Sequence, residues 1–355
     1  MPPSGRLVLF GTFRCGIACR REFVARLTPA GDPDPTFGSP PNFPGVVIQP
    51  AVSMSGDAEL QGLLVKPGGG ILLGYLRPVG AYGGPPTAPS VLRLASDGRE
   101  VSSVPLPMTF SPQSLLPDGS MLGLSGRAVV RLRPDLSPDG DFGTGGAAAI
   151  PASVRFVHGV AAARRAVLVG GSDRRGFVLA RLSPTGTITR VARLPVPGWA
   201  TGPRGTVAQI GVREDGSAVL VGRIWTKAGR VLSPGTVIGA FRADGRPDLR
   251  FGNRGLIRLS DQDSRVAVQR NRKLVVLASV PAPNGRPGAV LVLRRFRADG
   301  RRDPTFPIRR VRTAARFFAG LDVGIDGRGR IIAAGGAFRG NSGNGLHLVR
   351  FRGGR

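Results

Sequence analysis

Short apolar runs of four to seven residues follow one another along the whole chain, and turns rich in glycine, proline and aspartate separate them. No window of twelve or more residues shows the 3.6-residue periodicity of an amphipathic helix. Runs of this length between turn residues are typical of β-strands. The pattern predicts an all-β protein.

The apolar runs and turns also belong to a longer unit that repeats along the chain. Its clearest copy is VIGAFRADGRPDLRFG at 237–252, in which an apolar strand enters an Asp-Gly turn and Asp248 and Phe251 follow at fixed offsets. Related copies stand at 291–306, 23–38 and, less well kept, 128–143. A second glycine-centred turn joins two further apolar runs in each repeat, and Asp-Gly supplies the positive φ that a tight hairpin needs. We therefore expect four strands in each repeat.

Taking Arg26 in the third strand as the marker, seven copies follow, at Arg26, Arg93, Arg131, Arg181, Ala240, Arg295 and Arg350. A mean spacing of about 54 residues with four strands per unit is typical of propeller blades rather than solenoid turns. The sequence predicts one β-propeller domain over 1–355, with about seven blades of four antiparallel strands. The repeats are expected at approximately 1–57, 58–108, 109–154, 155–203, 204–262, 263–313 and 314–355.

The two ends of the chain do not complete a ring in this scheme. The first copy begins at Gly5 with a turn and a second strand, and the last copy stops at Phe351 after a third strand. We therefore expect one blade to be incomplete at the chain ends and the N-terminus to be truncated, together with any signal peptide. No apolar run approaches the roughly 18 residues of a membrane-spanning helix.

The pattern Arg-Leu/Phe-x-x-x-Gly-x-x-Asp-x-x-Phe-Gly, alternating with x-Asp-Gly and a short apolar run, resembles the delta-60 repeat family. The match is good in the copies that reach Phe37, Phe251 and Phe306, fair at Phe142, and poor in the copies of Arg93, Arg181 and Arg350. The resemblance implies a bacterial, secreted or surface propeller. It implies no activity, because that family has no agreed catalytic or binding residues.

The repeated phenylalanines and aspartates are expected to be structural. They are Phe37, Phe142, Phe251 and Phe306, with Asp34, Asp139, Asp248 and Asp303 three residues before them. A recurring aromatic residue packs neighbouring repeats together, and the aspartates are expected to accept backbone N–H groups in a turn and to pair with third-strand arginines. The alternative is calcium at Asp32 and Asp34 or at Asp135, Asp139 and Asp141, although neither spacing matches a known calcium loop.

The net charge of +28 admits two interpretations. One is attraction to a polyanion, and the other is the arginine-rich composition that a GC-rich genome would produce. The densest basic segment is 294–316, a candidate polyanion patch whose alternative is a solvated blade face. Its arginines are Arg294, Arg295, Arg297, Arg301, Arg302, Arg309, Arg310, Arg312 and Arg316.

The sequence offers little catalytic chemistry. The two cysteines, Cys15 and Cys19, are expected to form a local disulfide rather than a metal site, which needs about four ligands, while two free thiols stay an alternative. The two histidines, His158 and His347, are expected to be ordinary strand residues. The nucleotide-binding, hydrolase and zinc-protease motifs are missing. We expect no cofactor and no catalytic residue.

The sequence therefore predicts a non-enzymatic binding or scaffold propeller of the bacterial envelope or exterior, with an unknown ligand. We expect a monomer, and an anionic polymer or a surface glycan is the candidate partner. The predicted binding surface is the set of long loops at 12–21, 76–89, 223–236 and 280–289. Two alternatives stay open: a polyanion-binding protein that uses its basic surface, and a hydrolase or lyase with a site in the central channel.

Overall fold

The computed structural model of the chain contains only β-strands and connections in the part that it describes. That part comprises residues 5–16, 19–39, 43–48, 52–53, 59–76, 89–106, 108–199, 206–228, 231–281, 289–311, 317–338 and 344–351. The chain divides into two compact units, residues 1–149 and 150–355, and each is described by itself. The described residues include no helix that is long and apolar enough to span a membrane.

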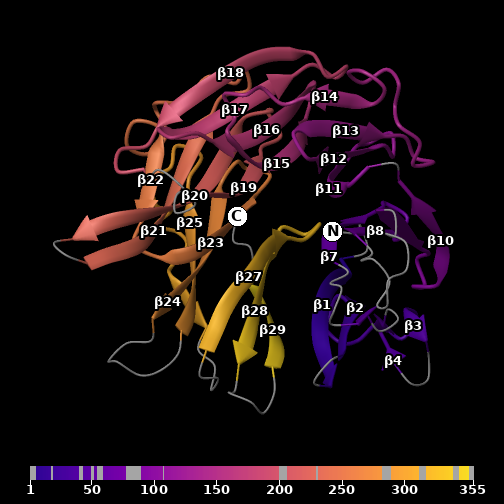
Figure 1. Cartoon of the computed structure of the whole chain (residues 1–355). Helices are drawn as coiled ribbons and strands as arrows, with labels where there is room; N and C mark the ends of the chain where they lie inside the picture. The colour runs from indigo at the N-terminus through magenta and orange to yellow at the C-terminus, as the bar shows by residue number, and fades with distance from the viewer. Residues whose placement is uncertain are drawn as a thin grey trace. The chain divides into compact units, whose positions relative to one another are not determined.

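The first unit contains three antiparallel sheets (Figure 1). In the first, β1 (Leu7–Gly16) pairs with β2 (Cys19–Leu27), which also pairs with β5 (Val46–Ile48) and β6 (Val52–Ser53); β3 (Gly38–Ser39) and β4 (Phe43–Pro44) form a short hairpin. The second joins β7 (Glu59–Val65), β8 (Ile71–Leu76), β9 (Ser90–Leu94) and β10 (Glu100–Pro105) in chain order. The third joins β11 (Ser111–Leu115), β12 (Met121–Ser125), β13 (Ala128–Leu132) and β14 (Ala147–Ala149).

The second unit contains four sheets, again with strands in chain order. Their strands are β15 (Phe156–Ala163), β16 (Ala166–Ser172), β17 (Gly176–Leu182) and β18 (Ile188–Pro195); β19 (Thr206–Val212), β20 (Ala218–Ala228), β21 (Val231–Phe241) and β22 (Leu256–Leu259); β23 (Gln262–Val268), β24 (Leu274–Pro281), β25 (Ala289–Phe296) and β26 (Arg309–Val311); and β27 (Phe317–Ile325), β28 (Ile331–Phe338) and β29 (Asn344–Phe351). The last sheet has three described strands.

The seven sheets are the blades of a β-propeller, which confirms the predicted fold class. Each sheet is formed by one continuous segment of the chain. In the second unit, the first strands of successive sheets lie side by side, β15 with β19, β19 with β23 and β23 with β27. Apolar side chains of neighbouring sheets share one core, as Leu168 and Phe177 of β16 and β17 do with Leu220 and Phe241 of β20 and β21.

Glycine in the Asp-Gly turn allows one blade to approach the next. Gly300 has a φ of +84°, and a Cβ atom there would lie 2.7 Å from the Gly252 nitrogen and 3.0 Å from the Phe251 ring. The Gly252 N–H donates a 2.7 Å hydrogen bond to the carbonyl of Asp299, the residue before Gly300. The first and second sheets make the same contact, from Gly38 N–H to the Asp97 carbonyl at 2.9 Å.

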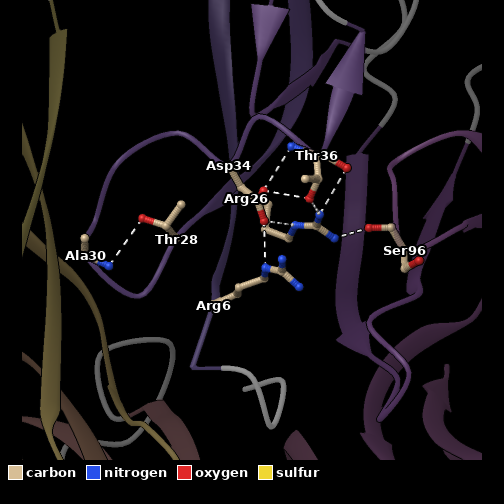
Figure 2. A network of polar contacts seen from close by, with 7 residues as sticks. All are labelled: Arg6, Arg26, Thr28, Ala30, Asp34, Thr36 and Ser96. Atoms are coloured by element: carbon tan, nitrogen blue, oxygen red, sulfur yellow. Dashed lines mark hydrogen bonds and ion pairs between the residues drawn. The ribbon is translucent and has the colours of Figure 1, made fainter.

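The repeated Arg and Asp residues belong to one network of polar contacts, which Figure 2 shows in the first repeat. Arg26 Nε donates to Asp34 Oδ2 at 2.8 Å, and its guanidinium also donates to the Ser96 carbonyl of the next sheet. The same guanidinium lies 4.7 Å from the centre of the Phe37 ring. Burial by itself raises the pKa of Asp34, but hydrogen bonds from Thr36 and the nearby guanidinium groups outweigh it and leave the pKa below its usual value.

The same arrangement recurs where the sequence motif is complete. Arg295 Nε lies 2.8 Å from Asp303 Oδ2 and its guanidinium lies 4.8 Å from the centre of the Phe306 ring. Arg131 Nε lies 3.0 Å from Asp139 Oδ2. The four repeated phenylalanines are buried. In the first repeat the network also joins one blade to the next, through the bond from Arg26 to the Ser96 carbonyl. The repeated aspartates and phenylalanines therefore pack and pair within the fold, as the sequence analysis expects of structural residues.

Two of the predicted long loops are strands, so this part of the prediction is wrong. The segment 12–21 continues β1 and β2 up to the pair Gly16 and Cys19, and the segment 223–236 continues β20 and β21 up to the pair Ala228 and Val231. Both segments pair because strand formation depends on the partner strand as well as on the local preference of the residues. Most of the other two predicted loops, residues 77–88 and 282–288, lies outside the described residues.

Candidate functional site

The connections β15–β16, β17–β18, β19–β20, β21–β22, β23–β24 and β25–β26 lie at one end of their three sheets, because successive strands are antiparallel. We call them the turn surface, which comprises residues 163–166, 183–187, 213–217, 242–255, 269–273 and 297–303. Contacts join these turns from sheet to sheet. Arg272 Nε lies 3.2 Å from Asp215 Oδ2, and Gly252 N–H binds the Asp299 carbonyl. The turns of the fifth and sixth sheets therefore adjoin one another.

Arginine dominates the exposed charge of the turn surface. The exposed arginines are Arg164, Arg165, Arg242, Arg246, Arg250, Arg254, Arg270, Arg272, Arg297, Arg301 and Arg302, and the exposed acids are Glu214, Asp215, Asp244 and Asp299. The four acids form ion pairs of 3.2–4.0 Å with Arg246, Arg270, Arg272 and Arg301. Seven exposed arginines are left without an ion pair among the described residues. Such a surplus attracts anions.

The predicted patch at 294–316 is divided by the fold. Arg295 is buried and paired with Asp303, and Arg294 is paired with Asp261. Arg297, Arg301 and Arg302 lie on the turn surface. Arg309 and Arg310 are exposed on the outer strand β26, and Arg312 and Arg316 lie outside the described residues. Arginines that are neighbours in sequence therefore lie in three different environments. Only Arg297, Arg301 and Arg302 contribute to the turn surface.

A cleft of about 510 Å³ opens in the turn surface between the fifth and sixth sheets. Arg242, Arg250 and Arg272 line it together with the carboxyl groups of Asp215, Asp248 and Asp299. The Ser217 hydroxyl and N–H bind Asp215 Oδ1 at 2.6 and 3.0 Å, and these bonds together with Arg272 and Arg213 outweigh burial and lower the pKa of Asp215. The cleft therefore presents ionised groups of both signs.

A smaller cleft of about 310 Å³ lies at the β16–β17 turn, away from the turn surface. Asp173 and the arginines Arg155, Arg174, Arg175 and Arg193 line it, and Arg193 is paired with Asp173. This cleft has a smaller volume, and its one acidic residue, Asp173, is already paired with Arg193. We therefore regard the larger cleft as the better candidate site.

The turn surface includes one functional candidate that the sequence analysis did not single out, Arg213. It is 3% exposed, and its guanidinium lies 5.5 Å from the centre of the Phe251 ring. The signal in the sequence was Ala240, which interrupts the series of third-strand arginines. In this repeat Arg213, from another turn, lies over the repeated phenylalanine instead.

The described part of the chain shows no metal site of the kind that the sequence analysis gave as an alternative. No group of three or more His, Cys, Asp or Glu side chains there could hold a metal ion. His158 on β15 has a buried Nε2 without a hydrogen-bond partner, and burial lowers its pKa. The side chains of His347, Cys15 and Cys19 lie outside the described residues, so the disulfide stays a prediction. The β1–β2 hairpin brings the backbones of both cysteines to paired strands.

No protein-family model matches the chain, and no curated protein matches its sequence. The chain is similar in structure to a protein of unknown function from Bacteroides caccae (12% identity, 97% of this chain, 89% of that chain, TM-score 0.40). It is also similar to the calcium-binding protein regucalcin from Agrobacterium tumefaciens (11%, 84% and 96%, TM-score 0.39) and to a glucose dehydrogenase (13%, 99% and 97%, TM-score 0.43). Similarity at this level carries no argument about function.

Proposed function

We propose that the protein is a non-enzymatic binding propeller that holds an acidic polymer on its turn surface. The observation that carries the proposal is the surplus of seven exposed arginines there without an ion pair among the described residues. Arginine binds phosphate, sulfate and carboxylate groups with two parallel hydrogen bonds. A polymer that spans several turns would gain from many such contacts at once.

The location of the protein outside the cell and its place among delta-60 repeat proteins remain predictions that accompany this proposal. They agree with a ligand such as an acidic surface glycan. A hydrolase or lyase site in the channel gains no support from the described residues, whose acidic groups on the turn surface serve as turn caps and ion-pair partners. The binding role is therefore the function that the geometry supports best.

The test is binding to heparin and to DNA over a salt series. The variant removes four unpaired charges from the turn surface, Arg250→Gln, Arg254→Gln, Arg297→Gln and Arg302→Gln. Because each phosphate contact contributes about 0.9 to the slope of log K against log salt for B-DNA, loss of four contacts is expected to reduce that slope by about 3 to 4.

The matched control removes the same number of charges elsewhere in the second unit, at Arg174, Arg175, Arg309 and Arg310, all of which are exposed. We expect this control to keep most of the affinity and the salt slope. Equal losses in the two variants would show that affinity follows net charge alone. In that case the arginines reflect composition and the turn surface is not a binding site.

A further inference from the structure

One repeat departs from the others at a single position of its third strand. Arg26 and Arg295 pair with Asp34 and Asp303 in their repeats. The corresponding residue of β21 is Ala240, although Asp248 and Phe251 are both present. Asp248 therefore lacks the arginine that its counterparts have, and no ion pair to it is found among the described residues.

Arg213 replaces part of what is missing. It comes from the β19–β20 turn rather than from the third strand, its guanidinium covers the Phe251 ring, and it donates to the Ala298 carbonyl at 3.3 Å. Arg26 contacts Phe37 and the Ser96 carbonyl in the same way. The replacement restores the contact with the next blade but not the pairing with aspartate.

The exchange leaves Arg213 and Asp248 with fewer polar contacts than Arg295 and Asp303 have. Arg213 Nε is buried without a hydrogen-bond partner in the described structure. Burial and the neighbouring Arg272 lower the pKa of Arg213, and Asp215 and Asp248 offset this only in part. A buried polar atom without a hydrogen bond is costly, so the Nε of Arg213 marks a place where the polar groups of this repeat are incompletely matched.

The 510 Å³ cleft opens at this same place. Its lining includes Asp248, Phe251 and Ala298, the residues around Arg213. Arg242 and Arg250 add exposed guanidinium groups that have no ion pair among the described residues. Asp248 accepts only the Arg250 N–H, at 3.3 Å, among the hydrogen bonds described for its carboxyl group. The cleft thus offers donors for an anion beside a carboxylate that can accept a hydroxyl.

We propose that this cleft is a binding subsite for an acidic sugar unit, with its anionic group held by Arg242 and Arg250, which line the cleft, and a hydroxyl group donating to Asp248. The subsite rests on the proposed function, since it defines the acidic polymer as a glycan. The polar groups that bind the ligand come from the repeat in which Asp248 and Phe251 are present but Ala240 replaces the third-strand arginine.

The decisive variant combines Ala240→Arg with Arg213→Gln. It copies the sixth sheet, in which Gln269 stands at the position of Arg213 and Arg295 pairs with Asp303. The net charge does not change, because one arginine is removed and one is added. The restored pair with Asp248 is expected to use up the carboxylate of the subsite, while the surface charge remains the same.

The experiment is titration of the full chain with glucuronate, glucose and acetate, followed by calorimetry or by NMR. The wild type is expected to bind glucuronate at least about tenfold more tightly than either control, and the double variant is expected to lose at least about tenfold, a factor that corresponds to about 1.4 kcal/mol. Asp248→Asn is the second variant and is expected to bind glucuronate no better than acetate. Urea unfolding confirms that each variant is folded.

Three results would overturn the subsite: no glucuronate binding by the wild type, equal binding of acetate, or full affinity in the double variant. The salt slope for heparin is measured on the same samples and tests the proposed function separately. A steep wild-type slope with no glucuronate binding rejects the subsite and keeps the polymer surface. Glucuronate binding without a salt slope rejects the polymer surface and keeps a site for a single sugar unit.

Discussion

Replacing Asp303 by asparagine tests whether the repeated Arg–Asp pair stabilises the fold. Asp303 and Arg295 have side-chain exposures of 2% and 1%, and they are joined at 2.8 Å. Asp303 also accepts the Thr305 hydroxyl at 2.7 Å and lies 3.0 Å from Lys273 Nζ. The substitution leaves the Arg295 guanidinium buried without its counter-charge. Breaking a buried pair in this way typically costs about 3–5 kcal/mol.

The chain provides a matched control in Asp248→Asn, at the same repeat position. Asp248 has no ion pair among the described residues, and Ala240 stands in place of the arginine. We expect this change to cost less than about 1 kcal/mol, the value of an ordinary hydrogen bond. The assay is urea unfolding followed by the fluorescence of the two tryptophans. Similar costs for the two variants, or a cost below about 1 kcal/mol for Asp303→Asn, would refute the reasoning.

Three further predictions concern single residues. Gly300→Ala is expected to lower the free energy of unfolding in urea by at least about 2 kcal/mol, because Gly300 combines a positive φ with a 2.7 Å approach to the next blade. Gly329 has a φ of +77° and no neighbour within 4 Å, so Gly329→Ala is expected to cost about 1 kcal/mol. Equal costs for the two variants would contradict the blade-to-blade contact. The pKa of Asp303 lies well below its usual 3.8, so its stabilisation is present above about pH 4 and is lost as the pH falls further, and Asp303→Asn is expected to flatten the acid limb of the stability–pH curve. Burial lowers the pKa of His158 from its usual 6.5, so stability is expected to fall as the pH drops through that value, and an NMR titration that gave a pKa of 6.5 or above would be contrary evidence.

Local chemistry determined the architecture. The Asp-Gly turns fix hairpins through residues that are adjacent in sequence, and the repeat spacing divides the chain into units of four short strands. This is why each of the seven sheets is formed by one continuous segment of the chain. The Asp-x-x-Phe motif likewise acts within its own turn, since Asp34 and Asp303 bind the N–H and hydroxyl groups of the threonines two residues later.

The prediction of loops was less successful because loop length depends on pairing. Glycine, proline and serine at 223–236 resemble a loop in the sequence, yet β20 and β21 pair across this segment. Hydrogen bonds to a partner strand offset the weak intrinsic preference of such residues, and strand propensity depends strongly on that context.

The sequence alone determined that this protein is an all-β repeat chain with arginine in excess, because turn signals and apolar periodicity act over a few residues. Only the tertiary structure decided which arginines are neutralised and which face solvent. Arg295 is buried and paired with Asp303, and Arg213 donates to the Ala298 carbonyl, 85 residues away in the sequence. Contacts between blades join residues that no local pattern connects, so the cleft beside Asp248 emerges only when two neighbouring repeats are packed together.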